Sequence, residues 1–325
     1  MLAASNTICA QQPELNESNV DQVLNAMTLE EKAQLLVGVR QNLVSGAAGA
    51  VAGFPQYGIP SVILADGPAG LRIDWKRNGD ANSYYTTAFP IGSSLAATWN
   101  ASLAQQVGAA MGNETKEFGC DVLLAPGINI HRNPLCGRNF EYLSEDPVLA
   151  GKVGAAIIRG IQNSGAGTSL KHFAVNSQED GRLEVNEVVS QRALREIYLK
   201  AFEIAVKEGR PWTVMSSYNR MNGPFTQENR ELLTTLLRDE WGFNGIVMTD
   251  WTGTRNTIAQ VHAGNDLMEW GIPEQVQQIV EGVKSGKLDI ADVNRNARRI
   301  LEFILKTPKY HGYKFTNKPD MKAHA

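Results

Sequence analysis

Strand-like and helix-like patterns alternate along most of this chain. Short apolar runs of the strand type end near residues 65, 125, 170, 217 and 249. A capping-box signature opens a helix at Thr28, and later helical patterns cover residues 101–118, 146–163, 190–208, 230–241, 254–262, 274–284 and 289–306. Such alternation is typical of a mostly parallel sheet with helical crossovers. We predict an α/β fold, specifically a (β/α)8-like TIM barrel in which one strand is irregular or missing.

An open, doubly wound parallel sheet is the structural alternative. That fold usually carries a Gly-x-Gly-x-x-Gly turn after its first strand. The turn after the first apolar run here is Asp66-Gly67-Pro68-Ala69-Gly70, which lacks this pattern, so the barrel is favoured. We assign residues 1–306 to the barrel. Residues 307–325 have little apolar periodicity and are predicted to be a linker toward a second domain that this chain does not contain.

Composition excludes several classes of function. The formal net charge of -3 provides no basic surface for nucleic acid. No apolar run approaches the roughly 20 residues that a membrane span needs, although the cellular compartment stays open. The three cysteines are widely spaced and have no histidine cluster nearby, and the chain lacks a phosphate-binding loop. We therefore expect no metal, no cofactor, no nucleic acid and no membrane as partners.

Four of the apolar runs end in polar or aromatic side chains. The run 246–249 leads to Asp250 and Trp251, and the run 61–65 leads to Asp66. The runs 167–170 and 213–217 lead to the Lys171-His172 pair and to Tyr218. The carboxyl ends of parallel barrel strands share one rim, so these side chains are expected to meet around one small molecule.

This set of side chains suits a neutral, polyhydroxylated ligand. Charged groups can form paired hydrogen bonds with neighbouring hydroxyls, and an aromatic ring can cover the apolar face of a pyranose. A sugar is the natural candidate. If the reaction is glycoside cleavage, a carboxylate can attack the anomeric carbon, and Asp250 is the predicted nucleophile.

Each residue also has a purely structural interpretation. A single aspartate after a strand, such as Asp250, is more often an N-cap of the next helix than a catalyst. Asp66 could form a turn, Trp251 could fill the core, and the Lys171-His172 pair could lie on the surface. A dense charged segment is usually a solvated ion-pair network, as could hold for Arg132, Arg138, Glu141, Glu145 and Asp146. The coincidence of all these side chains at strand ends favours the functional interpretation.

Four ordered motifs of this sequence resemble glycoside hydrolase family 3, in its β-glucosidase branch. They are Gly137-Arg138-Asn139-Phe140-Glu141 with Ser144-Glu145-Asp146-Pro147, Ser169-Leu170-Lys171-His172-Phe173, Met215-Ser216-Ser217-Tyr218-Asn219 and Gly245-Ile246-Val247-Met248-Thr249-Asp250-Trp251. The resemblance extends from about Val20 to Lys306. It implies a retaining enzyme that removes β-linked glucose from the non-reducing end of oligosaccharides or glucosides, with Asp250 as the nucleophile.

The resemblance also implies a sugar-binding shell. Its members would be Asp66, Arg72, Arg138, Lys171, His172, Arg182, Met215, Tyr218 and Trp251. Lys171 and His172 would donate hydrogen bonds to sugar hydroxyls, and Tyr218 would hold Asp250 in place. Arg132 is the alternative to Arg138.

The sequence departs from the family pattern in the acid/base group. Single-domain members carry a loop ending in Asp-x-His after the Lys-His pair, whereas residues 173–182 here do not match it. The acid/base glutamate is therefore expected on a C-terminal α/β sandwich domain that is absent, with Glu179 or Glu184 as substitutes. A β-xylosidase, a non-catalytic sugar-binding module and an aldolase using Lys171 as a Schiff base remain alternatives.

Overall fold

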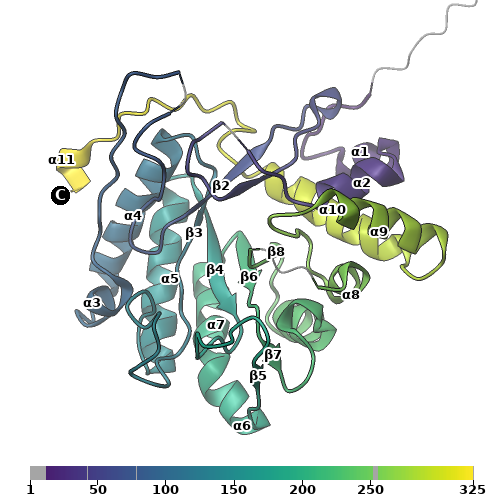
Figure 1. Ribbon diagram of the computed structural model, residues 1–325. Helices are drawn as coiled ribbons and strands as arrows, with labels where there is room; N and C mark the ends of the chain where they lie inside the picture. The colour runs from purple at the N-terminus through teal and green to yellow at the C-terminus, as the bar shows by residue number, and fades with distance from the viewer. Residues whose placement is uncertain (1–11, 42, 78, 252–254, 325) are drawn as a thin grey trace, which may run out of the picture.

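The computed structural model describes residues 12–41, 43–77, 79–251 and 255–324. Its centre is a curled sheet in the order β1-β2-β3-β4-β6-β8 (Figure 1). Neighbouring strands from β2 to β8 are parallel, whereas β1 runs antiparallel to β2. The predicted barrel-like α/β fold is confirmed, with β1 as an irregular member. The strands are β1 (Gly49–Val51), β2 (Val62–Asp66), β3 (Val122–Leu124), β4 (Gly167–Phe173), β6 (Thr213–Ser216) and β8 (Ile246–Thr249).

Two short segments close this sheet into a barrel. The segment of Leu267 and Met268 bridges β8 on one side and Val37 on the other. Val39 in turn pairs with Ala50 of β1. The six strands and these two segments together occupy the eight strand positions of a (β/α)8 barrel, and we call each position a stave. A separate two-stranded pair, β5 (Asn186–Glu187) and β7 (Arg220–Met221), lies outside the barrel wall.

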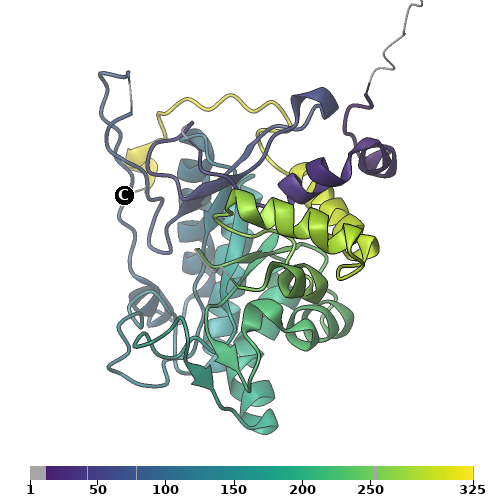
Figure 2. The ribbon, with the colours of Figure 1, turned by 45° about the vertical axis from the view of Figure 1, so that its right-hand side comes forward.

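Helices cover the barrel in two groups. The long helices α4 and α5 and the shorter α7 pack together on one side, as the blue and teal ribbons of Figure 1 show. The N-terminal helices α1 and α2 pack against α9 and α10 on another side (Figure 2). The helices are α1 (Val20–Ala26), α2 (Leu29–Leu35), α3 (Gly92–Ala96), α4 (Ala101–Glu117), α5 (Pro147–Asn163), α6 (Gln191–Ala193), α7 (Lys200–Ile204), α8 (Thr257–Ala263), α9 (Pro273–Lys284), α10 (Ile290–Ile304) and α11 (Met321–His324).

Local capping chemistry fixes several helix starts as the sequence predicts. Thr28 and Glu31 form the expected capping box of α2. The Asp146 side chain accepts hydrogen bonds from the first turn of α5, where Pro147 occupies the first helical position. Helix α8 begins at Thr257, later than predicted, with Asn256 as its cap. The predicted start at residue 254 lies outside the described residues.

Two predicted helices have a different internal geometry. The predicted helix 190–208 consists of α6, the π-helical segment η2 (Leu194–Tyr198), α7 and a second π-helical segment, η3 (Ala205–Gly209). The predicted helix 230–241 is the π-helical segment η5 (Glu231–Glu240). An amphipathic sequence pattern marks the buried face of a helix, but it does not distinguish bonds to residue i+4 from bonds to residue i+5.

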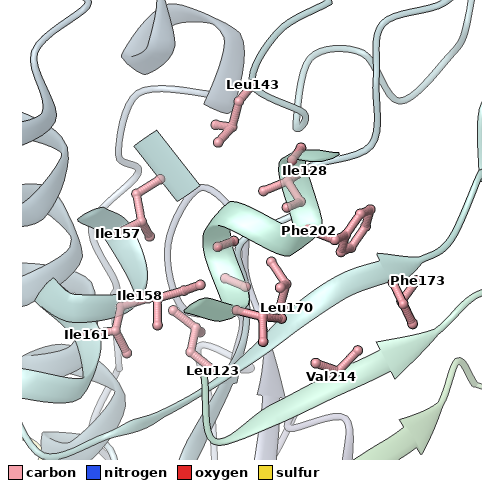
Figure 3. Close-up of a cluster of buried hydrophobic side chains, with 14 of the residues drawn as sticks. Leu123, Ile128, Leu143, Ile157, Ile158, Ile161, Leu170, Phe173, Phe202 and Val214 are labelled. Atoms are coloured by element: carbon pink, nitrogen blue, oxygen red, sulfur yellow. The ribbon is translucent and has the colours of Figure 1, made fainter. Parts of the chain in front are cut away.

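Alternate residues along the strands belong to two separate apolar clusters. Leu123, Leu170 and Val214 belong to the same cluster as Ile157 of α5 and Phe202 of α7 (Figure 3). Other positions of the same strands join the second cluster, which includes Leu124, Met215 and Met248 with residues of α1, α2 and α10. The period of two along each strand thus directs alternate side chains to opposite faces of the sheet.

The predicted linker runs along the barrel surface, where it is the yellow trace in Figures 1 and 2. The backbone N–H of Lys309 donates to Oδ1 of the buried Asp121 at 3.0 Å. Further along, Nδ1 of His324 lies 2.8 Å from Oε1 of the buried Glu114 on α4. These contacts attach residues 307–324 to the barrel, and whether this segment leads to a second domain stays a prediction.

Two single turns of 3-10 helix complete the described structure, η1 (Pro55–Tyr57) and η4 (Thr226–Glu228). Among the described residues, the helices lack the combination of length and hydropathy that a bilayer span requires.

Candidate active site

A pocket of about 450 Å³ lies at the carboxyl ends of the parallel strands. All ten residues that the sequence analysis singled out line it: Asp66, Arg72, Arg138, Lys171, His172, Arg182, Met215, Tyr218, Asp250 and Trp251. Residues 46–48, Leu124 and Trp270 complete the lining. Side chains from β2, β4, β6 and the end of β8 therefore converge on one cavity of the size that binds a small molecule.

Asp250 lies directly after β8 and is 8 % exposed. Its Oδ1 accepts a hydrogen bond from the backbone N–H of Trp251 at 2.8 Å. Burial raises the pKa of Asp250, while the Trp251 N–H and the positive charges of Lys171 and Arg138 oppose that rise. Asn256 caps α8, so Asp250 is not the cap of that helix. Oδ2 of Asp250 lies 3.7 Å from Nε2 of His172.

Lys171 and Asp66 form an ion pair across the pocket. Lys171 is 3 % exposed, and its Nζ lies 2.7 Å from Oδ1 of Asp66. Arg72, whose side chain is largely exposed, reaches the other carboxylate oxygen at 3.2 Å. Burial alone would raise the pKa of Asp66, but the charge and hydrogen bond of Lys171, with help from Arg72, lower it below the usual value. Asp66 is thus held as a carboxylate with a fixed orientation.

His172 is neutral and has a partner at each ring nitrogen. Its Nε2 lies 3.0 Å from Nη2 of Arg138, and its Nδ1 lies 3.1 Å from the hydroxyl of Tyr142. Burial lowers the pKa of His172 well below its usual value, and the charges of Arg138, Lys171 and Arg182 add to this. A guanidinium group can only donate, so Nε2 accepts and the proton resides on Nδ1. The contact with Asp250 is therefore not an ion pair.

Both Lys171 and His172 face the pocket because β4 is irregular at this point. The register between β4 and β6 shifts between Leu170 and Phe173, which re-aims the two side chains. The Asn129 side chain fixes the backbone of His172, accepting from its N–H at 2.7 Å and donating to its C=O at 2.9 Å. These bonds hold the irregular segment in one geometry.

A model of the glycosyl hydrolase family 3 N-terminal domain matches residues 15–303. The chain belongs to glycoside hydrolase family 3. It is 44% identical over 295 residues to the thermostable beta-glucosidase B of Acetivibrio thermocellus, a match that covers 88% of this chain and 38% of that protein. It is 45% identical over 285 residues to an exo-alpha-(1->6)-L-arabinopyranosidase of Bifidobacterium longum, covering 86% and 37%.

Solved structures give the same family. The beta-glucosidase 3B from Thermotoga neapolitana, solved in complex with glucose, superposes with a TM-score of 0.92 at 48% identity. That match covers 94% of this chain and 45% of the other. This family 3 chain therefore spans less than half the length of these relatives.

The arginines of this family 3 chain divide into those at the pocket and those away from it. Arg138 lines the pocket and also pairs with Oε1 of Glu141 at 2.6 Å. Arg132, the alternative considered from sequence, is not among the lining residues, and its charge instead acts on Glu187 and Tyr198. The pocket geometry favours Arg138 over Arg132.

Tyr218 contacts both Asp250 and the residue that follows it. Its hydroxyl donates to the carbonyl oxygen of Trp251 at 2.5 Å. Burial raises the pKa of Tyr218, and the charge of Asp250 and a side-chain hydrogen bond with Asp250 raise it further. The same hydrogen bond favours the ionised form of Asp250, as expected from sequence. The Trp251 indole is fixed at the other end, because its Nε1–H donates to the Ala48 carbonyl at 3.0 Å. Tyr218 therefore holds both the carboxylate of Asp250 and the backbone of Trp251.

The two glutamates considered as substitute acids are engaged elsewhere. Oε2 of Glu179 lies 2.6 Å from Arg182, and Oε1 of Glu184 lies 3.0 Å from Arg255. Neither glutamate lines the pocket. Their ion pairs with Arg182 and Arg255 hold these two carboxyl groups outside the pocket lining, so neither is placed to act as the acid.

Sequence reasoning missed Glu269 and Trp270, although a signal was present. Leu267-Met268 is followed by an acid and a tryptophan, as Met248-Thr249 is followed by Asp250 and Trp251. The run 267–268 is too short to count as a strand on its own, and only its bridges to β8 and Val37 reveal it as a barrel stave.

Glu269 is buried without a side-chain partner. It is 2 % exposed, and neither carboxyl oxygen has a hydrogen bond within the described part of the chain. Its carboxyl group occupies the space left by two glycines, since a Cβ at Gly38 or Gly49 would lie within 2.6 Å of it. Burial raises the pKa of Glu269 well above the usual value.

Replacing Glu269 by methionine is expected to raise the free energy of unfolding by about 1 to 3 kcal/mol at neutral pH, because a buried polar group without a partner costs about that much. The folded protein keeps a proton on Glu269 that the unfolded chain releases. Wild-type stability should therefore fall as pH rises from about 4.3 toward the folded-state pKa, by up to about 1.4 kcal/mol per pH unit. The methionine variant lacks this dependence.

Denaturant unfolding at several pH values measures the effect. The exposed Glu281, replaced by methionine, is the matched control and should behave as wild type. A difference between wild type and the Glu269→Met variant that stays constant with pH would contradict this account.

Proposed function

We propose that this chain is the sugar-binding barrel of a retaining β-glucosidase, with Asp250 as its nucleophile. The observation that carries the proposal is the position of Asp250. This carboxylate lies in the pocket wall, free of any capping role, near the cations of Lys171 and Arg138. The beta-glucosidases among its relatives support the same activity.

In the proposed reaction the carboxylate of Asp250 attacks the anomeric carbon. A covalent glycosyl-enzyme forms as the bond to the aglycone oxygen breaks, and a general acid protonates that oxygen. Water then attacks the same carbon with base assistance and releases the sugar with retained configuration. The acid/base would be a glutamate outside this chain, a proposal consistent with the greater length of the relatives.

The remaining pocket residues would bind the glycone. Asp66 would accept hydrogen bonds from the hydroxyls farthest from the cleaved bond, and Lys171 and Arg72 would donate to neighbouring ones. His172 has both nitrogens occupied, so we assign it to orienting Arg138. Arg182 would orient this shell, while Met215, Tyr218 and Trp251 would form the wall.

Incubation with a 2-deoxy-2-fluoro-β-glucosyl fluoride and mass spectrometry test the proposal. We expect a stable adduct on the peptide that contains Asp250, because fluoride leaves without protonation. Without a general acid, the chain should cleave natural disaccharides about 10²- to 10⁴-fold more slowly than a complete enzyme. A failure to label Asp250 would contradict the proposal, as would disaccharide turnover at the full rate.

The same experiment separates the alternatives. A sugar-binding module would retain glucose affinity and form no adduct. Fluoro sugars of the xylose and L-arabinopyranose series distinguish a xylosidase or an arabinopyranosidase, and the arabinopyranosidase relative makes the latter comparison worthwhile. An aldolase needs a lysine amine that is free to attack a carbonyl, whereas Nζ of Lys171 is engaged with Oδ1 of Asp66 at 2.7 Å.

A further inference from the structure

A row of hydrogen-bonded side chains runs behind the candidate pocket and joins two of its arginines. Its middle members are Tyr142, which lies between β3 and α5, and Asn176, which follows β4. Tyr142 is fully buried and Asn176 is 2 % exposed, and neither lines the pocket. The Tyr142 hydroxyl oxygen lies 3.1 Å from Nδ1 of His172 and 3.0 Å from Nδ2 of Asn176. One phenol oxygen thus serves two neighbours.

One end of the row is Arg138. Its Nη2 lies 3.0 Å from Nε2 of His172 and 2.6 Å from Oε1 of Glu141. The Arg138 guanidinium also lies 5.7 Å from the centroid of the Tyr142 ring, and the His172 ring meets that ring edge-on. The orientation of Arg138 therefore depends in part on His172 and Tyr142.

The other end of the row is Arg182. Nδ2 of Asn176 lies 3.2 Å from Oε1 of Glu179, whose Oε2 lies 2.6 Å from Nη1 of Arg182. The Arg182 guanidinium then lies over the Tyr218 ring, 5.3 Å from its centroid. Since Asn176 also donates to Tyr142, the two ends of the row are joined at that hydroxyl.

The chemistry of the donors sets the direction of each hydrogen bond. A guanidinium only donates, so Nε2 of His172 accepts from Arg138, and the ring proton on Nδ1 is donated to the Tyr142 oxygen. The Asn176 amide turns its NH2 group toward the Glu179 carboxylate, and this group also donates to the Tyr142 oxygen. The Tyr142 oxygen accepts from both sides, so it stabilises the histidine tautomer that can accept from Arg138.

The backbone that presents Asn176 is strained. Val175 has a φ of 60°, in the left-handed region that β-branched residues rarely adopt, and it is 2 % exposed. The side chains of Ser217 and Asn219 donate to the Ala174 carbonyl at 2.9 and 3.2 Å and so hold the preceding residue. Strain that buried contacts maintain in this way is typical of segments that a functional site requires.

We propose that Tyr142 and Asn176 are positioning residues of the sugar pocket. Neither would contact the sugar, and each holds one of the two pocket arginines through the side chain between them. This inference rests on the proposed function, because its kinetic consequence is read at the nucleophile. Arg138 is the arginine whose charge acts on Asp250, so its orientation should affect how readily that carboxylate ionises.

The first test measures how fast 2-deoxy-2-fluoro-β-glucosyl fluoride labels Asp250 as a function of pH. Labelling needs the ionised carboxylate and no general acid, so its acid limb reports the ionisation of Asp250. Tyr142→Phe leaves the Nδ1–H of His172 without its acceptor, and we expect labelling to be about tenfold slower. The acid limb should also shift to higher pH by about half a unit, because Arg138 is held less firmly near the carboxylate.

Asn176→Ala separates the two ends of the row. It leaves the bond between His172 and Tyr142 intact, so the acid limb should stay at its wild-type position, while glucose should bind about threefold or more less tightly. Combined with Tyr142→Phe, it should slow labelling by less than the product of the two single effects, because both substitutions act at one hydroxyl. Independent effects would overturn the coupling of the two ends.

The ¹⁵N chemical shifts of the histidine rings test the row without any reaction. We expect the proton of the wild-type His172 ring on Nδ1. A proton on Nε2 would overturn the proposal, whether or not the chain is labelled. Absence of labelling in wild type would overturn the proposed function instead, and the tautomer would then decide the positioning role of Tyr142.

Tyr57→Phe is the matched control. The Tyr57 ring is also buried, and its hydroxyl bonds to the Ala26 carbonyl and to Glu31, none of which lines the pocket. This variant should lose stability but keep the wild-type labelling rate and acid limb. If Tyr142→Phe behaves like Tyr57→Phe, with an unchanged rate and an unshifted limb, Tyr142 is structural only and the proposal is overturned.

Discussion

Replacing Asp250 by asparagine is expected to lower the rate of phenol release from an activated aryl β-glucoside by at least about 10⁴-fold. An amide of the same shape cannot form the glycosyl ester, and it also removes the negative charge that faces Lys171 and Arg138. The loss should appear in the turnover number, since the hydroxyl-binding residues stay in place. Steady-state kinetics with a nitrophenyl glucoside measure it.

An added nucleophile distinguishes lost chemistry from lost folding. In Asp250→Ala, azide can enter the vacated space and attack the anomeric carbon from the same side as the carboxylate. The product should be the α-glucosyl azide, with the phenol as leaving group. Residual activity of Asp250→Asn within about tenfold of wild type would rule out Asp250 as the nucleophile.

Replacing Lys171 by methionine is expected to lower kcat/KM for the same glucoside by about 10²-fold or more. The Lys171–Asp66 pair is removed from water at the lysine end, and losing one partner of a buried pair costs about 3 to 5 kcal/mol. Asp66 would keep the exposed Arg72 and the backbone hydrogen bond of Gly67, and it would lose its buried charged partner, so its orientation toward the sugar would be less fixed. Kinetics and glucose affinity, measured together with thermal unfolding, separate binding from stability.

A double-mutant cycle with Asp66→Asn checks the coupling. The two substitutions should be strongly non-additive, because they remove the same pair. Lys152→Met is the control, since Lys152 pairs with Glu208 on the surface and such pairs contribute about 0 to 1 kcal/mol. Additive effects, or a loss within threefold for Lys171→Met, would contradict a shared role.

The sequence allowed prediction of the barrel and of the residues that line its pocket. Buried parallel strands are read from short apolar runs, and a polar residue directly after such a run must lie at the rim. Asp66, Tyr218 and Asp250 are cases in point, and each of them lines the pocket. The capping box at Thr28 and the helix start at residue 146 were also predicted, because a helix start depends on a few neighbours along the chain.

Other features were beyond local patterns. The antiparallel direction of β1 and the stave at Leu267 and Met268 depend on pairing between segments far apart in the chain. The π-helical geometry of η5 reflects bonding that an apolar period does not report. The aromatic wall of Trp270 was missed for the same reason, since its stave is recognisable only once the barrel is closed.

The sequence by itself determined which chemical groups follow the strands, since alternation and strand ends are properties of neighbouring residues. Only the tertiary structure decided what those groups do to one another. Packing gave His172 two partners and a neutral ring, and it paired Lys171 with Asp66. It also buried Glu269 beside two glycines, with no side-chain partner among the residues that the structure describes. The physical reason is that charge state and orientation depend on desolvation and on contacts between distant segments, which no local pattern encodes.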